Sequence, residues 1–413
     1  MTHKWFKPRG YKHFDAPVGE RFANECAAEP EFVRKHSWLP LVHYVKRVKR
    51  YKPKECKTVY KDRPIMYASH RDACILSKYA HDLSRCLDVF YEHNGLSGNV
   101  IAYRRLGKSS YDFSADAYRF CLMNLPCIVL CFDITGFFDN LDHSILKDRL
   151  KTILGVSELA DDWYKVFRHV TAFKRVERSD LAAHPVFGPR LKLKTSDPIA
   201  RISDIVAAGV PIFENENKYG IPQGTPISSA LSNTYMINVD IAMSFICRDR
   251  NALYQRYSDD ILIACRPEDG GEITAQLHST IESEHKLEIK PEKTERVVFN
   301  RDSIMSFQYL GFNVSTNGAR IRPSSMSRQW RKLRRNVRRM KRAGMIAVAT
   351  GKSPKIYTKK LRRQFSPVGA RNFSSYARRS AEAFRSKAIL RQIRRLERHA
   401  DDMIRDLRKE PSD

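Results

Sequence analysis

Apolar residues recur at helical spacing in five segments of the first 250 residues. We predict helices there: Asp72–Asp88, Tyr111–Asn124, Leu141–Leu154, Ser157–Phe173 and Ile227–Ile246. Pro226 stands near the first turn of the last segment, a position that a helix tolerates. Residues 1–30 and 174–214 show no such period, so we expect an irregular arm and a loop-rich insertion in these two places.

Two other apolar segments have the character of β-strands. Cys127–Asp133 is a continuous apolar run that ends in a carboxylate. Leu253–Cys265 consists of two apolar runs joined by Tyr257-Ser258-Asp259-Asp260, which predicts a hairpin with two adjacent carboxylates at its tip. Strands that alternate with helices, together with an antiparallel hairpin, predict an α+β fold.

The pattern changes again after Pro323. One apolar stripe, flanked by nine Arg and Lys, predicts a helix that ends at Gly344: Met326, Trp330, Leu333, Val337 and Met340. A second helix is predicted over Ser375–Lys409, with apolar residues that step by four and three: Ile389, Ile393, Leu396, Ala400, Met403 and Leu407. This spacing fits a coiled-coil seam. The run is short for one, so we favour a helix bundle that packs on itself.

The charge of the chain is strongly positive and unevenly distributed. The 413 residues carry a net charge of +28, and 42% of them are hydrophobic, which is enough for a sizeable core. From Ala319 onward there are 29 Lys and Arg against 7 Asp and Glu, whereas the rest of the chain is nearly balanced. A protein this basic most plausibly meets nucleic acid, and its last quarter is the expected contact.

Other features of the composition exclude several classes of protein. The nine cysteines form no Cys-x-x-Cys pair, which argues against a zinc ribbon and favours a reducing cytoplasm. The N-terminus has no apolar signal segment, and no apolar run approaches 18 residues. Secretion and membrane spanning are therefore not expected.

Two predicted strands each deliver an aspartate, and such strands can converge. Asp133 ends one strand, and Asp259 and Asp260 stand at the tip of the hairpin. Divalent cations prefer oxygen ligands, and a pair of metal ions clamps the attacking and leaving oxygens of a phosphoryl transfer. Tyr-x-Asp-Asp by itself is equally typical of a solvated turn, so the order of the surrounding motifs matters.

That order is specific. Five motifs follow one another along the chain: FDITGFFDNLDH (residues 132–143), GIPQGTPISSALSN (220–233), YSDD (257–260), LEIKPEKT (287–294) and FQYLGF (307–312). From about Arg63 to Phe312 the chain resembles the reverse transcriptases. The resemblance implies a right-hand polymerase: an N-terminal arm and fingers (1–115), a palm of antiparallel sheet with helices (116–315) that carries a fingers insertion (about 150–215), and an α-helical basic thumb that binds RNA (316–413).

The resemblance also assigns the catalytic metals, two Mg²⁺ with Mn²⁺ as a possible substitute. Asp133 and Asp259 match the metal-binding aspartates of the family, and the carbonyl of Ile134 matches a further ligand. Asp260 either binds metal or sets the local potential. Lys293 in LEIKPEKT matches a lysine that neutralises or protonates the departing pyrophosphate, and its alternative is a lysine in a charged surface loop.

The same resemblance assigns contacts to the incoming dNTP. Phe138, five residues after Asp133, matches the steric gate against a 2′-hydroxyl, although a core aromatic beside Phe137 is the alternative. Gln223 matches a residue that contacts template and nucleotide. One of three cations is expected to grip the triphosphate, and the sequence does not decide which: Lys61, Arg63 and Arg71.

RNA is expected on the first thumb helix, whose polar face carries a row of cations: Arg328, Arg331, Lys332, Arg334, Arg335, Arg338 and Arg339. YASHRDA (67–73), YRRLGKSSYDF (103–113) and the compact length resemble stand-alone bacterial reverse transcriptases of phage defence, most closely the type 2 defence-associated enzymes. Such enzymes copy a structured non-coding RNA into cDNA, and we favour a monomer.

Two alternatives stay open. The first is a retron- or group II intron-derived enzyme with another role. However, IPQGTPISSALSN departs from the TPQGG pattern of intron enzymes, and the chain shows neither the retron Val-Thr-Gly element nor a Cys/His nuclease module or room for an RNase H domain. The second is a catalytically inactive RNA-binding scaffold, which the intact Asp133, Asp259 and Gln223 disfavour.

Overall fold

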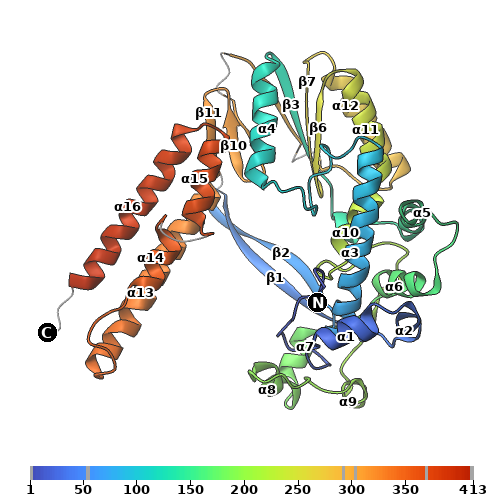
Figure 1. The fold of residues 1–413 in the computed structure, drawn as a ribbon, viewed down its shortest axis with the longest axis vertical. Helices are drawn as coiled ribbons and strands as arrows, with labels where there is room; N and C mark the ends of the chain where they lie inside the picture. Colours follow the sequence, from blue (N-terminus) through green and yellow to red (C-terminus); the bar gives the residue numbers. More distant parts are fainter. Residues whose placement is uncertain (1–2, 53–55, 291–293, 302–304, 368–370, 410–413) are drawn as a thin grey trace.

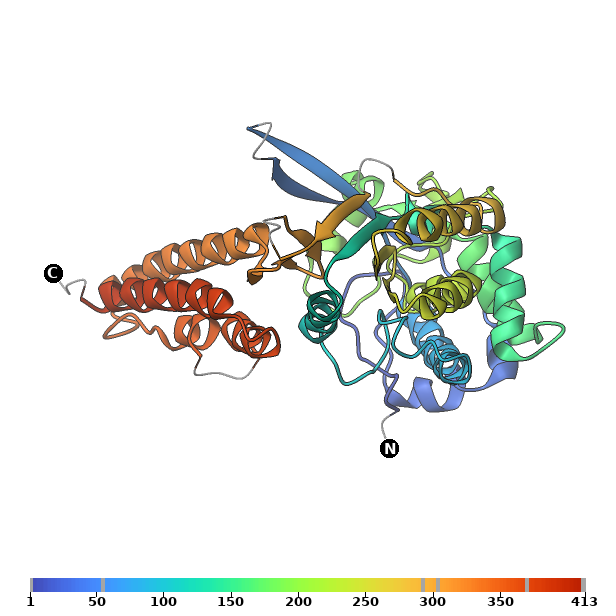
Figure 2. The same ribbon diagram turned by 90° about the horizontal axis from the view of Figure 1, so that it is seen from above.

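The computed structural model describes residues 3–52, 56–290, 294–301, 305–367 and 371–409. It has an α+β fold with the right-hand arrangement of fingers, palm and thumb. Figure 1 shows a body of sheets and helices, a bundle of helices that stands apart from it, and a long β-hairpin between the two. Seen from above, this hairpin projects from the body on the side of the helical bundle (Figure 2).

The palm is built on a four-stranded antiparallel sheet with the order β6-β7-β3-β8. Its strands are β3 (Cys127–Asp133), β6 (Leu253–Tyr257), β7 (Asp260–Cys265) and β8 (Glu295–Phe299). The bounds of β3 and the β6–β7 hairpin confirm the two strand predictions made from the sequence.

Both faces of this sheet are buried, which explains why its central strands are continuously apolar. Alternate residues of β3 enter different cores. Ile128, Leu130 and Phe132 pack with helix α3 (His70–His93) and the helices that follow β3. Cys127 and Val129 pack on the other face, with helix α4 (Ser110–Met123) and the C-terminal segments. The sheet is thus held rigidly between two layers, and the ends of its strands are fixed in space.

Helices surround the palm and the adjoining fingers. The N-terminal ones are α1 (Glu20–Phe22), a π-helix (Ala23–Ala27) and α2 (Pro30–Lys35). The larger ones are α3 (His70–His93), α4 (Ser110–Met123), α5 (His143–Leu154), α6 (Asp161–Thr171), α10 (Ser228–Tyr235), α11 (Ile237–Asp249) and α12 (Gly270–Ser279), which continues into a π-helix (Thr280–Glu284). A 3₁₀-helix (Phe137–Asp139) follows β3.

The prediction of one helix over Ile227–Ile246 was wrong at its centre. The chain forms α10 and α11 with a break at Met236, whose N–H bonds to the carbonyl of Asn233 instead of continuing the helical ladder. Just before the break, the hydroxyl of Tyr235 donates to the carbonyl of His285 at 2.6 Å. Contacts with a distant segment therefore fix the end of α10, and local sequence does not reveal them.

A long hairpin of β1 (Leu41–Lys52) and β2 (Lys57–Tyr67) was not predicted from the sequence. It forms a sheet with β4 (Lys174–Glu177) and β5 (Phe213–Glu214) in the order β2-β1-β4-β5. Beyond its base the hairpin has no buried face: over residues 44–49 and 57–65 the side chains are exposed or partly buried. Strands without a buried face need no alternation of apolar and polar residues, so the strand pattern is missing from the sequence here.

The expectation of an irregular segment over 174–214 was also wrong. Besides β4 and β5 it contains α7 (Arg178–Ala183), α8 (Phe187–Lys192) and α9 (Ile202–Ala207). These short elements share a small core of their own, which includes Val176, Leu181, Phe187 and Ile205. Helices of six residues are too short to show a helical period, so only the tertiary structure reveals them.

The C-terminal region starts with a three-stranded sheet and continues as the helical bundle of the thumb. The strands are β9 (Phe307–Tyr309), β10 (Phe312–Ser315) and β11 (Gly318–Ile321). The helices are α13 (Pro323–Ala349), α14 (Lys359–Phe365), α15 (Phe373–Ala383) and α16 (Lys387–Lys409). Among the described residues, no helix has both the length and the apolar content needed to cross a membrane.

Two helix boundaries of the thumb differ from the predictions. Gly344 does not end a helix; it lies within α13, where a Cβ atom would come within 2.7 Å of Ile356. Ser375–Lys409 is not one helix, because the chain turns at Arg385 with a φ of +49°. Ser386 accepts a hydrogen bond from the N–H of Ile389 and so starts α16 anew. Gly344 thus lets α13 pack closely against Ile356. The Ser386 cap starts a new helix where the apolar spacing had predicted one continuous helix.

The favoured helix bundle is confirmed over the coiled-coil alternative. The apolar stripe of α16 packs inside the thumb against α13, α14 and α15. Ile389, Ile393, Leu396 and Ala400 are almost fully buried in the same core as Leu333 of α13. The apolar residues that step by four and three along α16 therefore pack within one helix bundle of this chain.

Candidate active site

Strand pairing brings two of the predicted carboxylates together at one end of the palm sheet. The register of β3 and β7 places Asp133 directly opposite Asp260. Because side chains alternate along a strand, both lie on the same face, with Cβ atoms about 5 Å apart. Like charges in directly opposed positions repel each other. This register therefore creates a place where a cation is favoured.

The third carboxylate, Asp259, stands in the turn of the β6–β7 hairpin. Ser258 and Asp259 form its two-residue loop, since β6 and β7 pair up to the residues on either side. The backbone N–H of Ile134 donates to the carbonyl of Asp259 at 3.4 Å, which ties this loop to the end of β3. Asp133 and Asp259 are partly buried, and Asp260 is exposed.

The turn is strained and is held by two hydrogen bonds. Ser258 has a φ of +62°, which an L-amino acid rarely adopts and glycine normally supplies in such a hairpin. The Tyr103 hydroxyl donates to its Oγ, and Arg256 donates to its carbonyl, both at 3.1 Å. Burial raises the pKa of the Tyr103 phenol, and Asp259 raises it further, so the hydroxyl remains a donor.

Arg256 anchors the turn from inside the protein. Both Arg256 and Asp240 are fully buried, and two hydrogen bonds of 2.7 and 2.6 Å join them. The guanidinium also donates to the side-chain oxygen of Asn233. Burial opposes the charge of Arg256, but Asp240 outweighs it and keeps the pKa of Arg256 raised. A permanently charged, fully bonded arginine therefore fixes the backbone that presents Asp259.

A lysine already lies beside the carboxylates, and it is not the one that the sequence suggested. The Nζ atom of Lys290 is 3.3 Å from Oδ2 of Asp133. Its backbone N–H donates to the carbonyl of Asp133 at 2.9 Å, so the segment runs alongside the end of β3. The predicted Lys293 lies outside the described residues.

The donor set suits a hard divalent cation. Asp133, Asp259 and Asp260 offer carboxylate oxygens only, which are the ligands that Mg²⁺ prefers. Among the described residues, no three acidic, His or Cys side chains lie close enough to enclose an ion by themselves. Mg²⁺ commonly binds through one or two carboxylates and completes its shell with water and substrate phosphates. The residues present therefore fit a site that substrate completes.

Phe138 lies where the chain turns away from β3. Gly136, with a φ of +49°, starts the 3₁₀-helix that carries it. Phe137 is buried in the core, whereas Phe138 is only partly buried and meets the Phe137 ring edge-on at 5.5 Å. The neighbouring phenylalanines thus have different surroundings: Phe137 is the core aromatic, and Phe138 packs against the same core but keeps part of its surface accessible.

Gln223 lies in a loop that joins the palm to the fingers. The N–H of Ile221 donates to the carbonyl of Phe138, and the N–H of Met66 donates to the carbonyl of Gln223, both at 2.9 Å. Gly224 has a φ of +122°, and a Cβ there would come within 2.7 Å of the Met66 carbonyl oxygen. The glycine is thus required for close contact between this loop and β2.

The three fingers cations are placed differently. Lys61 and Arg63 alternate with Ile65 on one face of β2, and a methyl group of Ile65 touches the position beside Gly224. Arg71 instead starts α3, with its guanidinium 5.9 Å from the centre of the Phe22 ring. The structure places Lys61 and Arg63 on the face of β2 that also carries Ile65, which lies against the Gln223 loop, and places Arg71 with the N-terminal helices.

The seven predicted RNA-binding cations all lie on the exposed face of α13. Met326, Leu333 and Val337 face the thumb core, as the stripe predicted. None of the seven cations forms an ion pair within the part of the chain that the structure describes. Their charge is therefore available to a partner.

Sequence reasoning missed Arg256, Asp240 and Lys290. A charged residue inside a strand, such as Arg256 in LYQRY, is a weak signal of a buried ion pair, because its partner lies 16 residues away on another element. Asp142, close to the site in sequence, caps α5 by accepting from the N–H groups of Ser144 and Ile145.

Comparison with protein families supports the arrangement. Residues 63–314, more than half of the chain, match the family described as reverse transcriptase (RNA-dependent DNA polymerase). No curated protein sequence matches the chain.

Solved structures with a similar fold share little sequence with the chain. Apo telomerase from Candida tropicalis has a TM-score of 0.48 and 14% identity, over 90% of this chain and 60% of that one. Telomerase from Candida albicans, in complex with a fragment of telomeric RNA, has a TM-score of 0.47 and 11% identity, over 90% and 63%. The RNA-dependent RNA polymerase of a human picobirnavirus has a TM-score of 0.37 and 15% identity, over 67% and 43%. The chain thus spans less than two thirds of the telomerase chains.

Proposed function

The chain belongs to the reverse transcriptase (RNA-dependent DNA polymerase) family and is an enzyme of that class; from this premise we propose that it copies a dedicated structured non-coding RNA into cDNA, as part of antiphage defence. Divalent metal ions, Mg²⁺ or Mn²⁺, support the reaction. The proposed regions are an N-terminal arm and fingers (1–115), a palm with an insertion (116–315) and an RNA-binding thumb (316–413).

One observation carries the proposal. Asp133 and Asp260 are paired across two strands on the same face, and a tight turn beside them adds Asp259. A fold that only needed stability would not oppose like charges and then present a third on a strained turn, because both features cost free energy. Strain and repulsion at one place are typical of a catalytic centre.

Each residue has a role in this proposal. Asp133, Asp259 and Asp260, with the carbonyl of Ile134, would hold two metal ions, which supply charge neutralisation and an activated 3′-hydroxyl. Lys290 holds Asp133 in place and adds positive charge near the triphosphate, and Lys293 remains the proposed acid for pyrophosphate.

Phe138 lies one turn beyond Asp133, where its ring would meet the sugar of a dNTP and exclude a 2′-hydroxyl. Gln223 contacts the template base and the nucleotide from the loop opposite. Arg63 and Lys61 share a face of β2 with Ile65, which lies against this loop, and they would bind the triphosphate. Arg71 is the weaker candidate, because its guanidinium packs over Phe22.

The RNA partner is supported by the thumb. Its first helix exposes seven cations without ion-pair partners among the described residues, and phosphate groups are the complementary charge. All nine cysteines are described and none forms a disulfide, which suits the proposed cytoplasmic location. We propose that one copy of the chain works with one RNA.

The polymerase site is tested by Asp133→Asn in a primer-extension assay with Mg²⁺. The amide keeps the shape of the side chain but removes a charge that the metals need, so extension should fall by roughly a thousandfold, as a loss of several kcal/mol requires. RNA binding should stay within about twofold. Asp148→Asn on α5, a change of an exposed carboxylate, is the matched control and should extend normally.

The RNA and the biological role need a separate experiment. Sequencing the RNA and DNA that co-purify with the active protein should yield one abundant structured RNA and cDNA complementary to it. Heterogeneous cellular RNA without cDNA would instead favour the inactive RNA-binding scaffold. Protection of cells from phage by the wild type, and its loss in Asp133→Asn, tests the defence role.

A further inference from the structure

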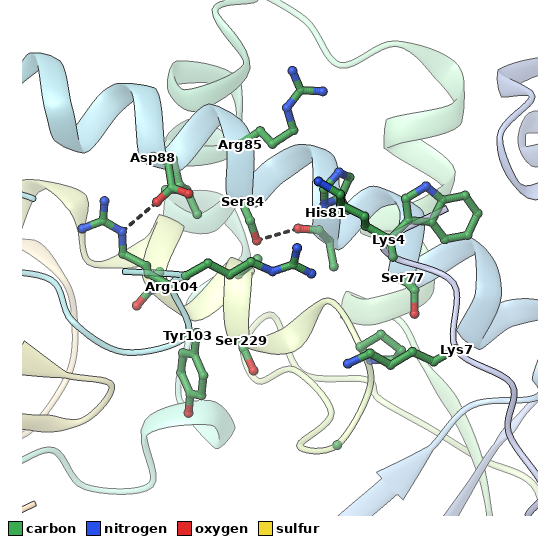
Figure 3. Close-up of a pocket in the computed structure, with 18 of the residues that line it drawn as sticks. Lys4, Lys7, Ser77, His81, Ser84, Arg85, Asp88, Tyr103, Arg104 and Ser229 are labelled. Atoms are coloured by element: carbon green, nitrogen blue, oxygen red, sulfur yellow. Dashed lines mark hydrogen bonds and ion pairs between the residues drawn. The ribbon is translucent and has the colours of Figure 1, made fainter. Parts of the chain in front are cut away.

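A hollow of about 570 Å³ lies beside the active site, between the N-terminal arm (residues 3–19) and helix α3. Figure 3 shows side chains of the arm and of α3 around it, with Tyr103 and Ser229 on the opposite side. The segment 101–105 and the start of α10 complete its wall. None of the roles proposed above uses this hollow.

Its wall is positively charged. Lys4 and Lys7 come from the arm, Arg85 from α3, and Arg105 from the segment that leads to α4. None of these four cations has an acidic partner among the described residues. The acidic residue of the wall, Asp88, is neutralised by Arg104, whose Nε donates to it at 2.7 Å. The hollow therefore has an excess of positive charge that only an anion can balance.

The pKa of His81, a residue of this wall, shows that several of the cations act at one place. Burial lowers the pKa of the His81 imidazole; Asp82 opposes this shift, while Arg105, Arg85 and Lys4 lower the pKa further. Three cations from three separate segments thus act on one histidine. The hollow is a shared electrostatic environment rather than a row of independent surface charges.

The arm that closes the hollow is firmly attached. Nη2 of Arg9 donates to the Ser77 hydroxyl of α3 at 2.8 Å, and the Tyr11 hydroxyl donates to the carbonyl of Ala68 at 2.7 Å. Phe6 is buried in the main core. The arm also precedes residue 63, where the family match begins. The part of the wall that the arm contributes therefore lies outside the residues that match the family.

Aromatic groups accompany the charge. Trp5 lines the hollow from the arm and is partly buried; His3 stacks on its ring with the centroids 5.0 Å apart, so a base can reach the part of the ring that faces the hollow. Tyr91 also lines the hollow, and Arg104 lies over its ring at 4.6 Å. Cations for phosphates and a ring for a base together match a nucleic-acid strand.

The hollow reaches the catalytic turn. Tyr103 lines it and also donates a hydrogen bond to Ser258, the residue before Asp259. Gly224 and Pro226, directly after Gln223, line its other end. A strand held in the hollow would therefore pass from the arm to the Gln223 loop, where the template base is read in the proposed reaction.

We propose that this hollow binds single-stranded RNA: the template nucleotides on the 5′ side of the base being copied, which have not yet been paired. The proposal rests on the template-copying function above. Lys4, Lys7, Arg85 and Arg105 bind the phosphates, and Trp5 stacks on a base. The N-terminal arm thus holds unpaired template next to the catalytic turn and feeds it forward one nucleotide at a time.

The test is a binding experiment that needs no catalysis. Labelled DNA primer annealed to RNA template, with a 5′ template overhang of zero or six nucleotides, is titrated with protein in the absence of dNTPs. The wild type should bind the overhang substrate about tenfold more tightly than the blunt one. Lys4→Glu with Lys7→Glu should lose most of this preference and should bind the blunt duplex as the wild type does.

Salt dependence gives a second readout. Each phosphate contact to a single strand contributes about 0.7 to the slope of log K against log salt. Loss of two contacts should therefore reduce the slope by about 1.4 for the overhang substrate and leave the blunt slope unchanged. Lys165→Glu with Lys192→Glu, the same charge change at two exposed positions elsewhere, is the matched control and should keep the overhang preference.

A second variant, on α3, tests whether the arm variant acts only by displacing the arm. Arg85→Glu alters the hollow from α3 and should also reduce the overhang preference. If both variants keep the full preference, the hollow does not hold template and the proposal is wrong. It is equally wrong if ATP binding, and not overhang binding, is lost in these variants, because the ligand is then a free nucleotide. Loss of extension in Asp133→Asn with an intact overhang preference would leave this proposal standing, so the two tests fail independently.

Discussion

The palm and the thumb use arginine in opposite ways. Arg256 in the palm is fully buried and bonded to Asp240, Asn233 and the carbonyl of Ser258. Arg335 and Arg338 on α13 are exposed and have no ion pair among the described residues. The first arrangement fixes the position of a turn, because a buried ion pair leaves little freedom. The second provides affinity for a polyanion, because the charge is not balanced within the protein.

This difference predicts how each region responds to its surroundings. Salt screens exposed charges within about 10 Å at 0.1 M but affects buried pairs much less. Binding by the thumb should therefore depend steeply on salt, whereas the geometry of the catalytic turn should not. Substitutions in the palm should change chemistry or stability, and substitutions in the thumb should change binding.

The largest effect is expected for Asp259→Asn. The amide keeps the shape of the turn and removes a metal-binding charge, so nucleotide addition should fall on the order of a thousandfold or more. The rate of single-nucleotide extension measures this, with RNA affinity as the control, which should not change. Activity within tenfold of the wild type would contradict the assignment of Asp259 to the metal site.

The stability of the palm gives the next test. Arg256→Met leaves the Asp240 carboxylate buried without a partner, so the free energy of unfolding should drop by about 3–5 kcal/mol. Adding Asp240→Leu should recover most of this loss, because the uncompensated charge is then removed. Urea unfolding measures both variants. For the matched thumb variant, Arg335→Met, the free energy of unfolding should stay within about 0.5 kcal/mol of the wild-type value. Equal losses at Arg256 and Arg335 would contradict the proposed difference between palm and thumb.

The thumb is tested by replacing Arg331, Arg334, Arg335 and Arg338 with Gln, which is also a good helix former. RNA binding should weaken, and the slope of log K against log salt should flatten by up to about three units if all four contact phosphate. Extension at saturating RNA should be nearly unchanged. Four exposed arginines of the body provide the control set for the same replacement: Arg21, Arg34, Arg168 and Arg201. An unchanged slope and affinity in the thumb variant would place the RNA site elsewhere.

The smallest effect concerns selectivity in the palm. Phe138→Ala removes the ring proposed to meet the sugar, so discrimination between dNTP and NTP should fall by roughly tenfold to a hundredfold. Matched single-nucleotide insertions with dNTP and NTP measure the ratio. Phe137→Leu, at the buried neighbour, should lower stability with little effect on the ratio. Equal discrimination in wild type and Phe138→Ala would show that Phe138 is a core residue.

The sequence by itself determined the features that depend on neighbouring residues. The continuous apolar run ending at Asp133 defined β3 to the residue, and the acidic pair between two apolar runs defined the β6–β7 hairpin. The stripe of α13 separated its core face from its cationic face. Strand period, turn chemistry and helical spacing are local properties, so they can be seen without a structure.

The tertiary structure decided what depends on contacts between distant segments. The pairing of Arg256 with Asp240, the position of Lys290 at Asp133 and the break at Met236 all require elements far apart in sequence to meet. The wall of the hollow brings together segments about 80 residues apart in sequence, which carry Lys4, Lys7 and Arg85. No repeating pattern of neighbouring residues predicts these contacts. Strand register and packing are set only when the two cores form around the palm sheet.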